Sequence, residues 1–246
     1  MTVSPLQPWL FRVLAVLVLT SVFAPVFAVD CGAKPVPYSA NYAVTRNGDQ
    51  DGSMQVALES NGEDAFSYRM DTRVGWGAFT AHVQQRSDFI WQDGAVLPAS
   101  FQATRKVSFF SSSESVDFDW VSMRATGTKK RDDFELDISP GMQDKLTIYL
   151  LLARALCEGE DAVAAYVVSG PELKPHRYQL QAIEPMETAL GYLQVFHLRT
   201  GTPDDKKQTD LWLSRETRFL PVRLVYRKND EITDMRLLDI SFGDGP

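Results

Sequence analysis

The sequence has few of the residues that most often ligate metals or act as catalytic bases. Its 246 residues include only two cysteines, Cys31 and Cys157, and three histidines. None of the histidines, His82, His176 and His197, belongs to a helical zinc motif or stands beside a cysteine. These absences predict no metal site and no cofactor.

Motifs of other catalytic classes are also missing. The chain has no G-x-S-x-G elbow, and Gly75-Trp76-Gly77 lacks the lysine and the spacing of a phosphate-binding loop. The acidic pairs Asp132-Asp133 and Asp204-Asp205 are adjacent in sequence. Neighbours on a strand point to opposite faces, so neither pair fits the facing carboxylates of a glycosidase. The sequence therefore predicts no catalytic residue.

Basic residues are fewer than acidic ones, 25 against 32, and the formal net charge is −7. An acidic chain repels the phosphate backbone, so nucleic acid is not an expected partner. After the first 28 residues, no stretch approaches the roughly 20 apolar residues that span a bilayer. We therefore expect no membrane span in residues 29–246.

The first 28 residues have the composition of a secretory signal peptide. Arg12 is their only charged residue and precedes the apolar run 13–19, and Val26 and Ala28 occupy the two positions that must be small. We expect cleavage after Ala28, leaving residues 29–246 as a single β-rich domain in the bacterial periplasm. A membrane anchor is the alternative, disfavoured by the short run and by Pro25. Lipid attachment at Cys31 is disfavoured because Asp30 precedes it.

We expect the two cysteines to form a disulfide. In an oxidising compartment two cysteines usually pair. A Cys31–Cys157 bond would close a loop of more than a hundred residues, which is worth about 4–5 kcal/mol in the chain-entropy model. The alternative is a buried Cys157 thiol at a helix end.

Alternation of apolar and polar residues predicts β-strands over much of the chain. Phe66, Tyr68 and Met70 alternate with Ser67 and Arg69, and similar patterns occur at 115–120, 133–138 and 222–227. A period of two is typical of antiparallel strands with one wet face. Pairs that favour tight turns separate these strands, at Asn47-Gly48, Asp51-Gly52, Asn61-Gly62, Asp93-Gly94 and Asn229-Asp230.

Residues 143–157 differ, because their apolar side chains recur at helical spacing. Ser139-Pro140 supplies a start signal and Gly159 a stop signal. A helix that is apolar nearly all round must be buried. The sequence therefore predicts a mainly β fold, an antiparallel and strongly curved sheet, half or whole barrel, packed around one central α-helix.

Aromatic residues in the predicted strands allow two interpretations. They fill the core and form cross-strand pairs, or they line an apolar cavity between the sheet and the helix that holds a lipid-like ligand. The residues predicted to line such a cavity are Trp76, Trp120, Leu146, Tyr149, Leu150 and Trp212.

The C-terminal half resembles a known family. The segments 188–192 (TALGY), 210–214 (DLWLS) and 220–223 (LPVR), in this order, are similar to the exported bacterial domain-of-unknown-function family 3108. The resemblance extends back through 97–101, the predicted helix and the strand 38–44. It implies a periplasmic β-rich domain without an established activity, and it supplies no catalytic residue.

Three functions fit these expectations. The first is a periplasmic binding or carrier module for an apolar, lipid-like ligand. The second is a structural or protein-interaction component of the cell envelope. The third, a hydrolase of envelope polymers, requires a histidine and a carboxylate together in a cleft.

Overall fold

The computed structural model describes residues 31–76, 79–201 and 206–243, and only the backbone of residues 50, 51, 76 and 79. The predicted signal peptide, residues 1–28, lies outside the described residues. The elements are β1 (Tyr38–Arg46), β2 (Asp49–Ser60), β3 (Ala65–Trp76), β4 (Phe79–Gln92), β5 (Ala95–Val107), β6 (Phe110–Asp119), β7 (Arg124–Lys129), β8 (Asp132–Asp137), α1 (Thr147–Glu158), β9 (Ala162–Ser169), β10 (Glu172–Thr188), β11 (Gly191–Thr200), β12 (Lys207–Ser214), the 3-10 turn η1 (Arg215–Thr217), β13 (Leu220–Lys228) and β14 (Glu231–Phe242).

All fourteen described strands belong to one antiparallel sheet, as the mainly β prediction requires. Their order is β8-β7-β6-β5-β4-β3-β2-β1-β14-β13-β12-β11-β10-β9, so the first and last strands of the chain pair at the centre. The sheet is open, because the outermost strands β8 and β9 do not pair. The whole barrel that was one form of the prediction is therefore not found.

The segment between β8 and α1 explains why the outermost strands stay apart. Gln143 forms a parallel bridge to Val167 of β9, with backbone hydrogen bonds from Gln143 to Tyr166 and from Val168 to Gln143. This segment occupies the edge of β9 that a closing strand would need. It also covers backbone groups that would otherwise be free to pair with another chain.

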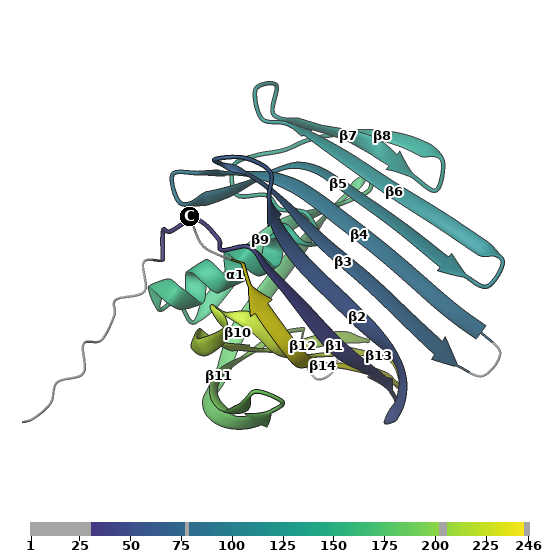
Figure 1. The fold of residues 1–246 in the computed structure, drawn as a ribbon. Helices are drawn as coiled ribbons and strands as arrows, with labels where there is room; N and C mark the ends of the chain where they lie inside the picture. The colour runs from purple at the N-terminus through teal and green to yellow at the C-terminus, as the bar shows by residue number, and fades with distance from the viewer. Residues whose placement is uncertain (1–30, 77–78, 202–205, 244–246) are drawn as a thin grey trace, which may run out of the picture.

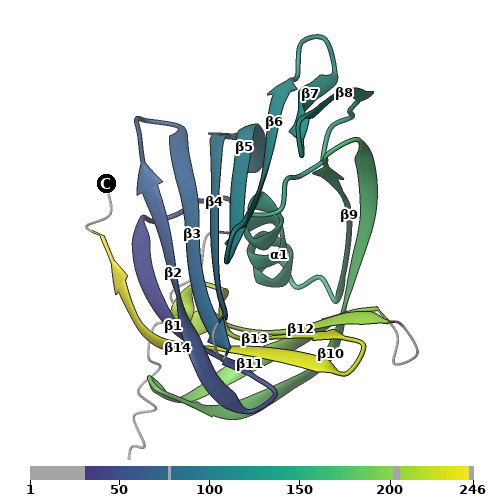
Figure 2. The ribbon, with the colours of Figure 1, turned by 90° about the vertical axis from the view of Figure 1, so that its right-hand side faces the viewer.

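The helix α1 lies between different parts of the sheet and contacts both (Figures 1 and 2). Figure 2 shows it nearly end-on, with β4 and β5 on one side and β9 on the other. Leu146 and Leu150 belong to a cluster made largely of residues from β1–β7, whereas Ile148 and Leu152 pack with β9–β13. The expected burial of this helix is therefore confirmed. Among the described residues, no helix is long and apolar enough to cross a bilayer.

The boundaries of α1 differ from the prediction at one end. The helix begins at Thr147, not near Gln143, and Ser139-Pro140 does not start it. The buried carboxylate of Asp144 accepts hydrogen bonds from the backbone N–H groups of Leu146 and Thr147 and so satisfies two free donors of the first turn. Gly159 ends the helix in the left-handed conformation, as predicted.

The turn predictions hold in full at two of the five pairs. Asn47-Gly48 and Asp93-Gly94 have positive φ at both residues, as tight hairpin turns require. The prediction at Asp51-Gly52 is wrong, because both residues lie inside β2. The register of β1 and β2 shifts at this point, and a Cβ on Gly52 would overlap the carbonyl oxygen of Arg73. Gly52 therefore serves a close approach of two strands, not a turn.

Candidate functional site

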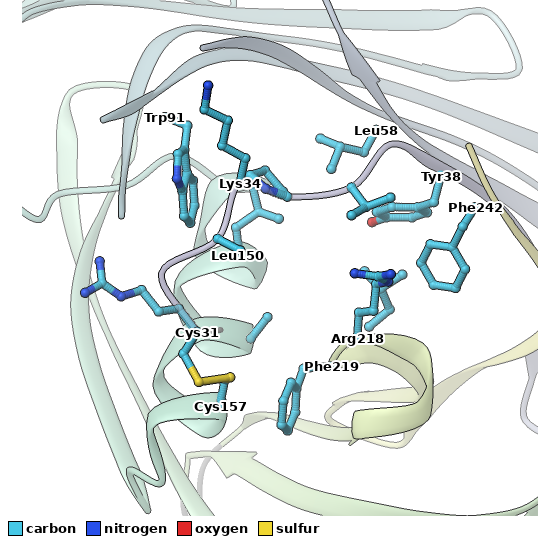
Figure 3. A pocket seen from close by; sticks show the side chains of 16 residues that line it. Cys31, Lys34, Tyr38, Leu58, Trp91, Leu150, Cys157, Arg218, Phe219 and Phe242 are labelled. Carbon is cyan, nitrogen blue, oxygen red and sulfur yellow. A yellow bond between two sulfur atoms is a disulfide. The ribbon is translucent and has the colours of Figure 1, made fainter. Parts of the chain in front are cut away.

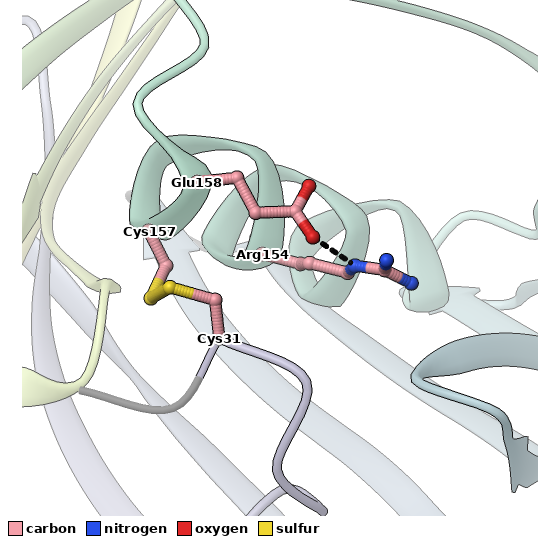
Figure 4. The surroundings of a disulfide bond; sticks show 4 residues. All are labelled: Cys31, Arg154, Cys157 and Glu158. Atoms are coloured by element: carbon pink, nitrogen blue, oxygen red, sulfur yellow. Dashed lines mark hydrogen bonds and ion pairs between the residues drawn. A yellow bond between two sulfur atoms is a disulfide. The ribbon is translucent and has the colours of Figure 1, made fainter. Parts of the chain in front are cut away.

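The two cysteines form the predicted disulfide (Figure 4). Cys31 precedes β1, and Cys157 lies in the last turn of α1, with a Cα–Cα distance of 5.5 Å. Arg154 forms an ion pair with Glu158 one turn along the same helix, at 2.8 Å between Nε and Oε1. The disulfide therefore fastens the segment 31–37 to the end of the helix.

A mainly apolar pocket of about 140 Å³ lies beside the disulfide (Figure 3). One wall is a single face of α1, because Leu150, Ala153, Arg154 and Cys157 follow one another at helical spacing. The segment fastened by the disulfide forms a second wall. Strand ends and the turn before β13 complete the lining with Tyr38, Leu58, Trp91, Arg218, Phe219, Leu220 and Phe242.

The pocket contains one buried polar group that lacks a partner. Tyr38 is 6% exposed, and its hydroxyl makes no hydrogen bond of ordinary geometry to a described residue; the polar group that acts on it most strongly is the Tyr68 hydroxyl. Burial raises the pKa of Tyr38 well above its ordinary value, so the phenol stays protonated and can donate. A buried hydroxyl without a partner is costly, and such groups are often satisfied by a ligand or a water.

Three cationic side chains surround this pocket. Lys34 pairs with Asp64 at 2.7 Å, and Arg154 donates to Glu158 and to the carbonyl oxygen of Gly94. Arg218 lies over the ring of Phe242 at 5.2 Å from the centroid, and no carboxylate of the described residues pairs with it. The pocket thus combines an apolar interior with one guanidinium, that of Arg218, which has no acidic partner among the described residues.

A larger, more polar groove adjoins the pocket. Its volume is about 640 Å³, and it shares Ala33, Lys34 and Trp91 with the pocket. The other residues that line it are Gly32 and residues in or next to the turns around Asp64 and Asp93. A ligand larger than the pocket can therefore continue along this groove.

The residues predicted to line a cavity are not brought together at this pocket. Leu150 lines it. Tyr149, the next residue of the helix, faces a much smaller cavity of about 10 Å³ near Tyr42 and Tyr68. Leu146 is 1% exposed and belongs to the packed core.

The three predicted tryptophans lie elsewhere. Trp120 stacks on Phe118 and donates its indole N–H to the carbonyl oxygen of Pro98. Trp212 lies on the face of β12 opposite Leu211 and Leu213, which pack with the helix. Its ring is stacked on that of His197, with 4.4 Å between the ring centroids. The side chain of Trp76 lies outside the described part of the structure. Trp212 is nevertheless buried, with 8% exposure, and it belongs to the same core cluster as Leu146 and Leu150.

The histidines lie on separate strands. His82 on β4 is hydrogen-bonded to Asp71 at 2.8 Å, and His197 on β11 to Asp210 at 2.7 Å. His176 on β10 stacks near Tyr178. None of the three lines the pocket beside the disulfide. Each of these two hydrogen bonds joins neighbouring strands, β4 to β3 and β11 to β12.

Sequence reasoning missed most of the pocket lining. The helical spacing of Leu150, Ala153 and Cys157 was visible in the sequence, and it marks one face of the helix. Tyr38 and Phe242 are 204 positions apart and meet only because β1 pairs with β14. No local pattern indicates that pairing.

Comparisons with known proteins agree with the fold and provide no activity. A β-barrel-like protein of a domain of unknown function, DUF1849, from Brucella abortus is similar in structure, with a TM-score of 0.58 and 13% identity over 86% of this chain and 100% of that chain. At this identity the likeness concerns the fold alone. No curated protein matches the sequence. The family model for the protein of unknown function DUF3108 matches residues 37–232, so the chain belongs to the DUF3108 family.

Proposed function

We propose that this protein is exported to the bacterial periplasm, with cleavage after Ala28, and that it binds one end of an apolar, lipid-like ligand in the pocket beside the disulfide. The observation that carries the proposal is the pocket itself, an apolar space of about 140 Å³ with the unpartnered Tyr38 hydroxyl in it. Apolar cavities of this size can bind a single aromatic ring.

The size of the pocket restricts the ligand. About 140 Å³ accommodates one ring or the end of an acyl chain, and a whole lipid does not fit. The rest of such a ligand would lie in the adjoining groove past Lys34 and Trp91. Arg218 and the Tyr38 hydroxyl favour a ligand with an oxygen acceptor, such as a carboxylate or an ester, close to its apolar part.

A variant that fills the pocket tests this proposal. Ala153 lines the pocket from α1, and Ala153→Phe would place a ring in the space. We expect binding of the fluorescent apolar probe N-phenyl-1-naphthylamine to weaken about tenfold or more, because a filled pocket has no room for the probe. Ala164→Phe, at an exposed position of β9, is the matched control and should bind the probe like the wild type.

Native mass spectrometry of gently purified protein is the second measurement. We expect a bound lipid-like molecule in the wild type and its loss in Ala153→Phe. Unchanged probe binding in Ala153→Phe, or a wild type that binds neither probe nor lipid, would overturn the proposal.

A further inference from the structure

The turn between β5 and β6 carries two exposed aromatic side chains. Phe109 and Phe110 have relative exposures of 101% and 81%. A large apolar side chain normally avoids water, and contiguous exposed apolar residues mark interaction sites. We call residues 105–110 the β5–β6 tip.

The apolar character of the tip extends into the sheet. In the register of the strands, Phe110 lies opposite Val107, Val107 opposite Ala81, and Ala81 opposite Val74. These residues form one row across β3–β6, and the last three are only partly buried. Phe110 therefore ends an apolar strip, and Phe109 lies next to it in the turn.

The charge of the tip is opposite to that of the whole chain. Arg105 and Lys106 are exposed, and residues 101–113 contain no acidic residue. The chain as a whole has a net charge of −7. In the next strands, the carboxylate of Asp71 is already bonded to His82 and faces Arg73 at 3.3 Å. The positive charge of the tip is thus not neutralised by its neighbours.

Exposed aromatic residues beside basic ones are suited to the surface of an anionic membrane. The rings enter the boundary between headgroups and acyl chains, and the cations are attracted to anionic headgroups. We propose that the β5–β6 tip docks the protein onto a lipid surface that contains anionic lipids.

The tip and the disulfide pocket lie at opposite ends of the strands. In the pairing of β4 with β5, Trp91 at the pocket end lies opposite Val96, whereas Ala81 lies opposite Val107 at the tip. Figure 1 shows the β5–β6 turn at the end of the long strands that points away from the C-terminus. The docking proposal therefore does not depend on the pocket, and the two can fail separately.

Vesicle co-sedimentation tests the docking proposal. Residues 29–246, which contain every described strand, α1 and the disulfide, are mixed with vesicles of phosphatidylglycerol and phosphatidylcholine in equal parts. This choice removes the apolar run 13–19, which can itself bind lipid. We expect the wild type to bind these vesicles, and to bind phosphatidylcholine alone about tenfold more weakly.

Variants locate the contact. Phe109→Ser with Phe110→Ser should weaken vesicle binding about tenfold or more, and Arg105→Gln with Lys106→Gln should remove the preference for anionic lipid. Val121→Ser is the matched control, because Val121 is 97% exposed in the β6–β7 turn at the other end of these strands. It should bind like the wild type.

Separate readouts distinguish this proposal from the proposed function. The tip variants should keep wild-type binding of N-phenyl-1-naphthylamine, and Ala153→Phe should keep vesicle binding. A wild type that ignores anionic vesicles would overturn the docking proposal. So would a Phe109→Ser/Phe110→Ser variant that binds vesicles undiminished, or an equal loss in Val121→Ser.

Discussion

Two tyrosines on the inner face of β1 have similar burial and different hydrogen bonding. Tyr42 is 3% exposed and donates to the carbonyl oxygen of Pro221 at 2.9 Å. Tyr38 is 6% exposed and has no partner among the described residues. An unsatisfied buried hydroxyl lowers the free energy of unfolding. Such unfavourable groups are common in binding sites.

This difference predicts opposite effects of the same substitution. Tyr42→Phe should lower the free energy of unfolding by about 1 kcal/mol, because it leaves the Pro221 carbonyl without its donor. Tyr38→Phe should leave stability unchanged or raise it slightly, because no bond is lost. Urea unfolding measures both variants. A loss in Tyr38→Phe as large as that in Tyr42→Phe would show that its hydroxyl is already satisfied.

At the scale of elements, one carboxylate joins three strands. Asp210 on β12 accepts hydrogen bonds from His197 and Arg199 on β11, each at 2.7 Å, and from Arg227 on β13. Its side chain is 1% exposed. Burial alone would raise the pKa of Asp210, but the hydrogen bonds from Arg199 and His197 hold it below its ordinary value.

The lowered pKa gives a pH-dependent prediction. Asp210 is more acidic in the folded chain, so its contribution to stability is present above pH ~4 and lost as the pH falls through the lower folded pKa. Asp210→Asn should lower the free energy of unfolding by about 1–3 kcal/mol at pH 7, because it removes charged hydrogen bonds. Urea unfolding between pH 7 and pH 2 should show this deficit shrinking below pH ~4.

Asp71 provides the control for this prediction. It pairs with His82 as Asp210 does with His197, but its side chain is 28% exposed. Asp71→Asn should therefore cost no more than about 1 kcal/mol at pH 7. A deficit in Asp210→Asn that stays constant down to pH 2 would contradict the assignment of the carboxylate as the cause.

At the scale of the whole molecule, the disulfide joins two segments that lie far apart in the sequence. Cys31 and Cys157 are separated by 126 positions. The bond restricts the unfolded chain, and the segment it fastens is also a wall of the pocket. Both stability and ligand binding should therefore depend on it.

Removing the disulfide should have two effects. The double variant Cys31→Ser/Cys157→Ser should lose about 2–5 kcal/mol of the free energy of unfolding. It should also bind N-phenyl-1-naphthylamine more weakly, because the wall 31–36 is no longer fastened. Dithiothreitol should reproduce both effects in the wild type and change nothing in the double variant. Full probe affinity in the double variant would show that the wall stays in place without the bond.

Local patterns in the sequence determined the kind of fold. Two-residue alternation set the antiparallel strands, because a sheet with one wet face buries every second side chain. Helical spacing and Gly159 set the helix and its end. Two cysteines in a sequence that is predicted to be exported indicated the disulfide, which the structure contains.

Only the tertiary structure decided how these elements close around one another and where the pocket lies. The pairing of β1 with β14 brings Tyr38 against Phe242, and the bridge from Gln143 to β9 keeps the sheet open. Such contacts join residues far apart in the chain, and their free energy depends on every element packed between them. A pattern confined to neighbouring residues carries no information on such pairings, so the sequence predicted the strands and the helix but not the pocket beside the disulfide.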